Sequence, residues 1–147
     1  MNAMEFAKFL RAVPTLLGAI NHRDTMEQLA EIVEESVEDN FHRQADVTGS
    51  TWPPRKDTLP HPLLIKTGKM KEAATGGDGQ YKRAERKGLK LGVKPDVVPY
   101  ARYHQYGTSR IPQRQYFYIH GSDRARLRKR FRELTMIKIL RAFGRRR

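Results

Sequence analysis

The sequence predicts an α+β domain that combines two N-terminal helices, a small antiparallel sheet, a short aromatic helix and a basic C-terminal helix. Three observations lead to this fold class. Apolar residues recur at helical spacing from Met26 to Phe41, alternate strictly from Leu89 to Val93, and return to helical spacing after Ser122. The first and third patterns predict amphipathic helices, and the second predicts a strand with one buried face.

Length and charge limit the classes of protein. The 147 residues fit one domain, 1–147, with an N-terminal helical segment at 1–22, a proline-rich loop at 46–62 and a basic C-terminal helix and tail at 122–147 as peripheral parts. Lysine and arginine number 29 against 16 acids, so the net charge is +13. Such an excess favours contact with nucleic acid or with an acidic protein, and charge alone does not choose between them.

Residue types that the sequence lacks exclude several kinds of site. There is no cysteine, which excludes disulfides and thiolate metal sites. No apolar run approaches the ~20 residues of a membrane helix, and the start of the chain lacks the basic stretch and long apolar centre of a signal peptide. We therefore expect a soluble protein without membrane contact that is not exported by that route.

The first two expected helices lie before residue 42. The first covers Glu5 to Leu17, and Pro14 is expected to kink or end it. The second begins at Asp24, which can cap it, while Glu27 completes a capping box. The apolar stripe of this second helix consists of Met26, Leu29, Ile32, Val33, Val37 and Phe41.

The opposite face of the second expected helix is acidic. It carries Glu27, Glu31, Glu34, Glu35, Glu38 and Asp39. Clustered carboxylates can form a metal or acid–base site, but along the outside of an amphipathic helix they are typical of a solvated face. In an oligomer this acidic face could meet the basic surface of a neighbouring subunit.

The composition changes at residues 46–62 to Gly, Ser, Thr and Pro, which predicts a long loop. Trp52, the only tryptophan, lies in its middle. Two roles remain open for Trp52, an interface contact and a contact that pins the loop to the core, and we favour the second. The histidines are isolated from one another in the sequence, so we expect no metal site.

A hairpin is expected around the glycine-rich turn from Gly76 to Gly79, with Lys71–Thr75 pairing with Gln80–Ala84. An alternative for the segment up to Ala74 is a helical turn. Thr67-Gly68-Lys69 lacks the preceding glycine of a phosphate-binding loop, which excludes a Walker-type site. The alternating strand that ends at Val93 then leads into a turn at Pro99.

The stretch from Val98 to Phe117 is rich in aromatic residues. A short helix is expected from Tyr100 to Tyr106, because Tyr100, Tyr103 and His104 would then share one face. Gly107 suits a left-handed residue that closes this helix. We expect the tyrosines to be half-buried packing residues with solvated hydroxyls, as in most aromatic clusters of small domains.

These residues also carry a family resemblance. Tyr100-Ala101 followed by His104-Gln105-Tyr106-Gly107, with Arg114 and Phe117 downstream, resembles a signature of the phage virion morphogenesis or tail-completion family. Trp52-Pro53-Pro54 and the segment from Leu64 to Met70 are similar to two earlier pieces of that pattern, in the same order. The match spans roughly Ala30 to Ser122, and it departs from the pattern at Met70, where leucine is usual.

The resemblance implies a structural protein of a tailed phage or prophage, located in the virion at the head–tail junction or the end of the tail and assembled in the host cytoplasm. Tail completion or head–tail joining by ring-like self-assembly would be its function, with other neck or tail proteins as partners. It implies no enzyme and no cofactor. Together with the aromatic spacing described above, it leads us to expect interface or packing roles for Trp52, Tyr100, Tyr103, His104, Gln105, Tyr106, Gly107, Arg114 and Phe117.

A final strand is expected at Tyr116–Ile119, and Ser122 or Asp123 can cap the last helix. The apolar stripe of that helix consists of Leu127, Phe131, Leu134, Ile137 and Leu140. Its basic surface, with the tail, includes Arg124, Arg126, Arg128, Arg130, Arg132, Arg145, Arg146 and Arg147. This surface could follow nucleic-acid phosphates, dock on the acidic helix of another subunit, or be merely solvated; all three alternatives stay open.

The sequence offers little for catalysis, since no serine or acidic pair has the surroundings of a catalytic group. The alternative to a virion protein is a small basic nucleic-acid-binding protein. In it the C-terminal helix would contact the nucleic acid and the tyrosine cluster would stack on bases. Weak non-specific contact with DNA is compatible with both hypotheses.

Overall fold

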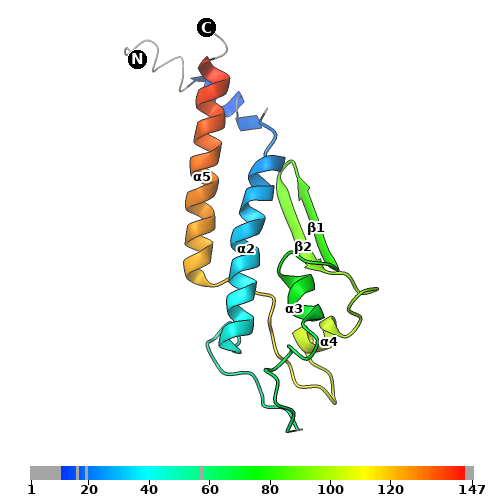
Figure 1. Cartoon of the computed structure of the whole chain (residues 1–147). Helices are drawn as coiled ribbons and strands as arrows, with labels where there is room; N and C mark the ends of the chain where they lie inside the picture. The colour runs from blue at the N-terminus through cyan, green and yellow to red at the C-terminus, as the bar shows by residue number, and fades with distance from the viewer. Residues whose placement is uncertain (1–10, 16, 19, 57, 145–147) are drawn as a thin grey trace.

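The computed structural model describes residues 11–15, 17–18, 20–56 and 58–144. Its elements follow in the order α2 (Arg23–Arg43), α3 (Lys69–Ala74), β1 (Gln80–Glu85), β2 (Gly88–Val93), α4 (Ala101–Tyr106) and α5 (Gly121–Gly144). The long helix α2 lies between α5 on one side and the β1–β2 hairpin on the other (Figure 1). The predicted α+β class is confirmed.

The central helix α2 forms where its apolar stripe predicts it, but its N-terminal cap differs. The N-cap residue is His22, without a side-chain cap bond, so the predicted capping box of Asp24 and Glu27 is wrong. Asp24 lies in the first turn instead, where a carboxylate interacts favourably with the helix dipole. Of the helix expected before it, residues 11–15 and 17–18 are helical, with Pro14 among them, and residues 5–10 lie outside the described residues.

The hairpin is real but pairs different segments from those predicted. Of the two alternatives for the segment up to Ala74, the helical one is confirmed and the strand is wrong: α3 occupies most of Lys71–Thr75 and buries Met70, Ala73 and Ala74 at helical spacing. The glycine-rich turn therefore connects α3 to β1. The antiparallel partner of β1 is β2, in the register Lys82 to Leu91, and the tight turn consists of Arg86 and Lys87.

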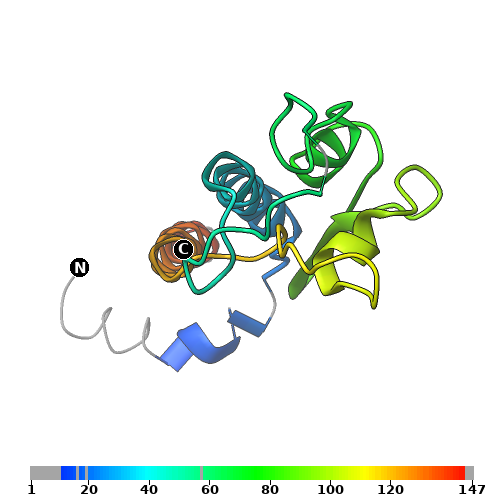
Figure 2. The same cartoon turned by 90° about the horizontal axis from the view of Figure 1, so that it is seen from below.

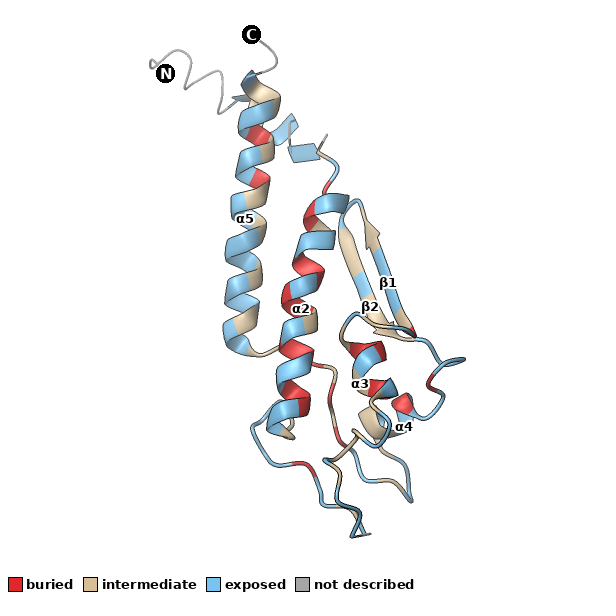
Figure 3. Cartoon of the chain, viewed as in Figure 1, coloured by how far each residue is buried: buried red, intermediate tan, exposed pale blue. Residues whose placement is uncertain are grey.

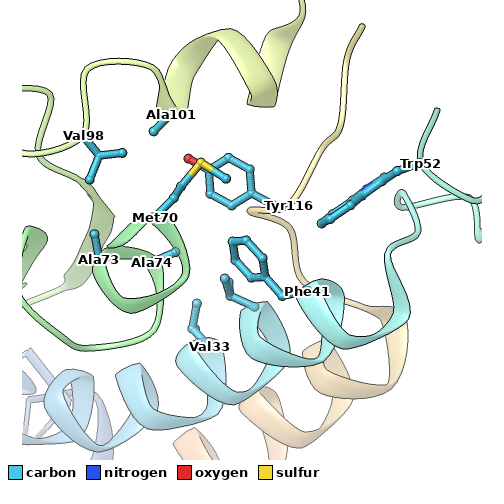
Figure 4. Close-up of a cluster of buried hydrophobic side chains, with 10 residues drawn as sticks. Val33, Phe41, Trp52, Met70, Ala73, Ala74, Val98, Ala101 and Tyr116 are labelled. Atoms are coloured by element: carbon cyan, nitrogen blue, oxygen red, sulfur yellow. The ribbon is translucent and has the colours of Figure 1, made fainter. Parts of the chain in front are cut away.

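The core lies where α2, α3 and the N-terminal end of α4 converge. Phe41 is in contact with two other rings, Trp52 at 6.1 Å and Tyr116 at 5.4 Å between centroids (Figure 4). Met70 and Val98 close the other side of the cluster. Trp52 is only 3% exposed, so it pins the proline-rich loop to the core, as we favoured. Burial, and to a lesser extent Tyr106, raises the pKa of Tyr116 to about 12, which keeps its hydroxyl protonated.

The predicted final strand at Tyr116–Ile119 is wrong. The segment is irregular chain without a strand partner in the described part of the structure. Side chains hold its backbone instead: the Asn40 amide donates to the carbonyl oxygens of Tyr116 and Tyr118, at 3.0 and 2.9 Å. The Tyr118 hydroxyl in turn donates to the carbonyl oxygens of Ala45 and Asp46, both at 2.9 Å. The run of aromatic and β-branched residues is typical of a strand, but these side chains replace the neighbouring strand.

The basic helix α5 runs alongside α2, as Figures 1 and 2 show from two directions. Only Thr135 and Ile139 of its 24 residues are buried, whereas α2 is buried along one whole face (Figure 3). Polar contacts join the two helices at both ends, with Arg126 on Glu35 at 2.6 Å and Lys138 on Asp24 at 3.4 Å. No helix among the described residues is long and apolar enough to cross a membrane.

Candidate interaction site

The motif residues of α4 and the segment after it form a connected set of contacts. The Gln105 side chain behaves like a peptide group towards the segment opposite: its oxygen accepts the backbone N–H groups of Tyr116, at 3.2 Å, and Phe117, at 2.9 Å. Its amide nitrogen donates to the carbonyl oxygen of Phe117 at 3.1 Å. Gln105 therefore supplies three hydrogen bonds that a neighbouring strand would otherwise supply.

Arg114 ties the same segment to the proline-rich loop. Its side chain is 7% exposed, and its guanidinium donates to the carbonyl oxygens of Pro53, at 2.8 Å, and Pro54, at 2.9 Å. Its backbone N–H donates to the carbonyl oxygen of His104 at 2.7 Å. Consecutive prolines keep this part of the loop out of helices and strand ladders, so its carbonyl oxygens remain available to side-chain donors, and a planar guanidinium can reach two of them at once.

His104 lies between α4 and a groove of about 470 Å³. Its ring packs edge-on against Tyr100, 6.2 Å between centroids, and Arg114, Arg55 and Met70 line the same groove. Burial, and then the Arg114 charge, lowers the pKa of His104 below its ordinary value. The imidazole is therefore kept neutral at physiological pH, which suits a packing residue.

Gly107 ends α4 with a backbone conformation that other residues avoid. Its φ is 74° and its ψ 169°, a positive φ as predicted but outside the left-handed helical region. A Cβ added here would lie 3.1 Å from the backbone nitrogen and the Cβ of Gln113. The motif glycine is thus explained by both conformation and space.

Of the three tyrosines at the start of α4 and within it, one is much less buried than expected. Tyr100 is 41% exposed and Tyr103 37%, which agrees with half-buried packing, and Arg102 lies over the Tyr103 ring at 4.7 Å. Tyr106 is 76% exposed, so the prediction that it packs is wrong. It sits on the solvent side of this short helix, where helical spacing alone did not distinguish the faces.

A second surface lies on α5, on the side away from the core. Exposed side chains follow one another at four-residue spacing along this helix, a row that forms a ridge on a helical surface. The row consists of Arg124, Arg128, Arg132, Met136 and Leu140. Its first half is cationic and its second half apolar, with Met136 50% and Leu140 53% exposed.

The predicted basic surface is therefore divided. Arg126 pairs with Glu35 of the same chain, and Arg130 reaches Gln28 at 3.3 Å and Glu133 at 3.5 Å. The acidic face of α2 is thus partly engaged within one subunit, by α5 and by Lys82, which binds Glu34 at 3.0 Å. Arg145, Arg146 and Arg147 lie outside the described residues.

Residues 4–135 of the chain match the model of the phage virion morphogenesis family. The match covers most of the sequence and contains every motif described above except the last part of α5. The chain belongs to the phage virion morphogenesis family. No curated protein and no solved structure matches it.

Family membership gives this morphogenesis protein a coarse function. It is a structural component in the making of a phage particle and is associated with the virion. The family is one of structural proteins and is not known for enzymes. In the described part of the chain no group of three His, Asp or Glu side chains is placed to hold a metal ion.

In this morphogenesis protein the structure brings some signature residues together and separates others. Trp52, Gln105 and Arg114 converge on the extended segment around Phe117, since the Trp52 indole N–H also donates to the Gln115 carbonyl oxygen at 3.1 Å. The arginines of α5 lie on another side of α2 and take no part in this cluster.

Asn40 is the important residue that the sequence analysis missed. It is fully buried, binds two carbonyl oxygens of the extended segment, and its own side-chain oxygen lies 3.0 Å from His120 Nε2. A signal existed: Asn40 falls three residues after Val37, on the apolar stripe of α2. A polar residue on a buried helix face has to find partners, so this position predicts a buried polar contact.

Proposed function

We propose that this protein completes the phage tail or joins it to the head, as a ring of copies in which α5 of one subunit contacts the next. The observation that carries the proposal is the exposed ridge of α5. A 24-residue helix that is buried at only two positions and exposes Met136, Ile137 and Leu140 offers apolar area to a neighbour.

The order of residues along the ridge suits a head-to-tail contact. Such a contact joins two different surfaces, and a chain of them closes into a ring when the rotation between subunits allows it. The apolar half, with Met136 and Leu140, would supply the buried area, while Arg128 and Arg132 would set orientation through exposed carboxylates such as Glu31 and Asp39. Surface ion pairs contribute only ~0–1 kcal/mol each, so assembly should weaken in salt without disappearing.

The test in solution is the native mass by light scattering, at several salt concentrations. The charge-reversal variant Arg128→Glu with Arg132→Glu should lose assembly while its thermal melt is unchanged, because both side chains are exposed and neither forms an ion pair with another residue in the described part of the chain. The variant Lys56→Glu with Arg110→Glu makes the same charge change at exposed loop positions and should assemble normally. A strict monomer at every salt concentration, also with purified tail proteins added, would refute the ring.

The test of the role in the virion is deletion of the coding sequence from the phage or prophage. Electron microscopy should show filled heads and separate tails in place of complete particles. Normal infectious particles from the deleted genome would exclude tail completion and head–tail joining together.

The second candidate function is nucleic-acid binding, which the three exposed arginines of the ridge favour. If Arg124, Arg128 and Arg132 neutralise DNA phosphates, log K should fall with log salt at a slope of about −0.9 per contact. We expect weak, sequence-independent binding that is lost near physiological salt. Tight binding at that salt, with assembly unaffected by the charge reversal, would favour this second function over the first.

A further inference from the structure

A second groove, of about 290 Å³, runs along one edge of the hairpin. Three consecutive residues of β2, Leu91, Gly92 and Val93, form one wall, and Arg102 and Tyr106 of α4 lie on the other. Successive residues of a strand point to opposite faces of the sheet, so a groove that touches three in a row follows the edge of the strand. None of the described lining residues belongs to β1, so this is the outer edge of β2.

The backbone groups on this edge can be assigned from the register. In an antiparallel pair, residues alternate between those that bond to the partner strand and those whose N–H and C=O point away. The N–H of Lys94 donates to the Gly79 carbonyl oxygen at 2.8 Å and continues the ladder, so the even-numbered residues of β2 bond towards β1. The N–H and C=O groups of Leu91 and Val93 therefore point into the groove.

Within the described residues the sheet has two strands only, and β2 pairs with β1 alone. Proteins usually protect such an edge with a bulge, a proline or a covering segment, because an open edge accepts a further strand. β2 contains no bulge and no proline, and its only such protection is the charge of Lys90, which disfavours a second basic strand but not an acidic one. Gly92 adds no side chain beside the edge, and a Cβ added to it would meet no atom within 4 Å.

Charge indicates what kind of strand fits. The segment from Gln80 to Lys94 carries six basic residues against one acid, Glu85, a net charge of +5, and Arg102 adds a cation across the groove. A second copy of β2 paired antiparallel on this edge through Leu91 and Val93 would place Lys90 opposite Lys94 of that copy, and like charges across a strand pair are destabilising. The groove therefore favours an acidic partner over a second copy.

We infer that the outer edge of β2 binds an acidic extended segment of a partner protein, which adds to the hairpin as a third strand. Main-chain hydrogen bonds to Leu91 and Val93 hold the segment, and the surrounding lysines and arginines select its charge. This contact lies on the opposite side of α2 from the α5 ridge and does not depend on ring formation.

The experiment uses the full chain and a short capped peptide of alternating glutamate and valine as the probe. Amide hydrogen exchange by NMR should show slower exchange at Leu91 and Val93 on saturation with this peptide, because their N–H groups become hydrogen-bonded. A lysine–valine peptide of the same length should bind at least about tenfold more weakly, since like charges then face each other. A glutamate–valine peptide with a central proline should give no protection.

A pair of variants locates the site. Arg102→Glu reverses the charge on the α4 wall of the groove and should abolish binding of the glutamate–valine peptide, whereas Arg110→Glu makes the same charge change on an exposed loop outside the groove and should not. Unprotected Leu91 and Val93 amides, equal binding of the lysine peptide, or unchanged binding by Arg102→Glu would each overturn the inference. Protection that appears without peptide as the protein is concentrated would overturn the choice of an acidic partner in favour of a second copy.

Discussion

The indole N–H of Trp52 donates a hydrogen bond to the carbonyl oxygen of Gln115 across 63 positions of sequence, at 3.1 Å. The ring itself lies edge-on to Phe41 and is almost completely buried. The contact joins the proline-rich loop to the extended segment, so one side chain contributes both packing and a hydrogen bond.

Substitutions at Trp52 separate those two contributions. Trp52→Ala should lower the free energy of unfolding by about 3–5 kcal/mol through lost burial, and Trp52→Phe by about 1–3 kcal/mol, mainly because the Gln115 carbonyl loses its donor. The matched control is Tyr106→Ala, which should stay within about 0.5 kcal/mol since that ring is 76% exposed. Urea denaturation measures all three. A loss at Tyr106 as large as at Trp52 would contradict the assignment of the core.

Gln105→Ala should destabilise the fold by about 1–3 kcal/mol, because the N–H groups of Tyr116 and Phe117 lose their acceptor in a partly buried place. Gln105→Glu keeps the acceptor and loses the donor to the Phe117 carbonyl, so it should cost less at neutral pH. Ser109→Ala, at an exposed position of the loop that follows α4, is the control. The melting temperature should be lowest for Gln105→Ala, higher for Gln105→Glu and highest for the control. Equal melting temperatures for Gln105→Ala and the control would show that the hydrogen bonds of Gln105 do not contribute to stability.

Gly107→Ala should destabilise by about 1–3 kcal/mol, the usual cost of a side chain in a positive-φ conformation that only glycine adopts readily. The close approach to Gln113 adds to that cost. Gly121→Ala, at the start of α5, has neither problem and should be neutral or slightly stabilising. Differential scanning calorimetry of the two variants compares their stability. An unchanged melting temperature for Gly107→Ala would be inconsistent with the positive φ of this residue.

Arg114→Lys should loosen the proline-rich loop although the charge is kept. An ammonium group is a point donor and cannot reproduce the planar guanidinium that reaches the carbonyls of Pro53 and Pro54 together. Limited trypsin digestion followed by mass spectrometry should show faster cleavage after Arg55 and Lys56 than in the unaltered protein. Arg110→Lys, on an exposed loop, serves as the control, and identical cleavage of all three proteins would argue against the tether.

Stability should fall as the pH drops below the ordinary histidine pKa of about 6.5. Burial first, and then neighbouring positive charges, lower the pKa of both His22 and His104 in the folded protein. At pH values between the lowered pKa of the folded protein and the ordinary pKa of about 6.5, the unfolded chain binds more protons than the folded one. The free energy of unfolding therefore increases with pH in that window. His104→Gln should reduce the dependence of the free energy of unfolding on pH, measured by urea denaturation at successive pH values. An unchanged dependence would show that His104 is not responsible for it.

Much of the fold could be predicted from the sequence because several segments bury one clear face. The stripe of α2 and the alternation of Leu89, Leu91 and Val93 each match one periodicity, and the structure follows both. The short helix α4 was predicted within one residue, since proline before it and glycine after it mark its ends.

The predictions that were wrong depend on tertiary contacts, which the local sequence does not show. The glycines from Gly76 to Gly79 are a stronger turn signal than Arg86-Lys87, so the hairpin was expected in the wrong place. The segment Tyr116–Ile119 has the aromatic and β-branched composition of a strand, but the side chains of Asn40 and Gln105 bind its backbone. Local sequence does not reveal contacts between residues so far apart in the chain. The exposure of Tyr106 depends on which side of a six-residue helix meets the core.

The sequence separation of Phe41 and Tyr116 determines when the core can form during synthesis on the ribosome. The two rings meet in the core at 5.4 Å, yet 75 residues separate their synthesis. At translation rates of about 5–20 residues per second, Phe41 is made some 4–15 seconds before its partner. During that interval the apolar face of α2 is exposed without the segment that covers it, which makes the nascent chain a client for chaperones in the host. Completion of the core therefore waits until Tyr116 has been synthesised, and a chain that stops before Tyr116 has no way to complete it.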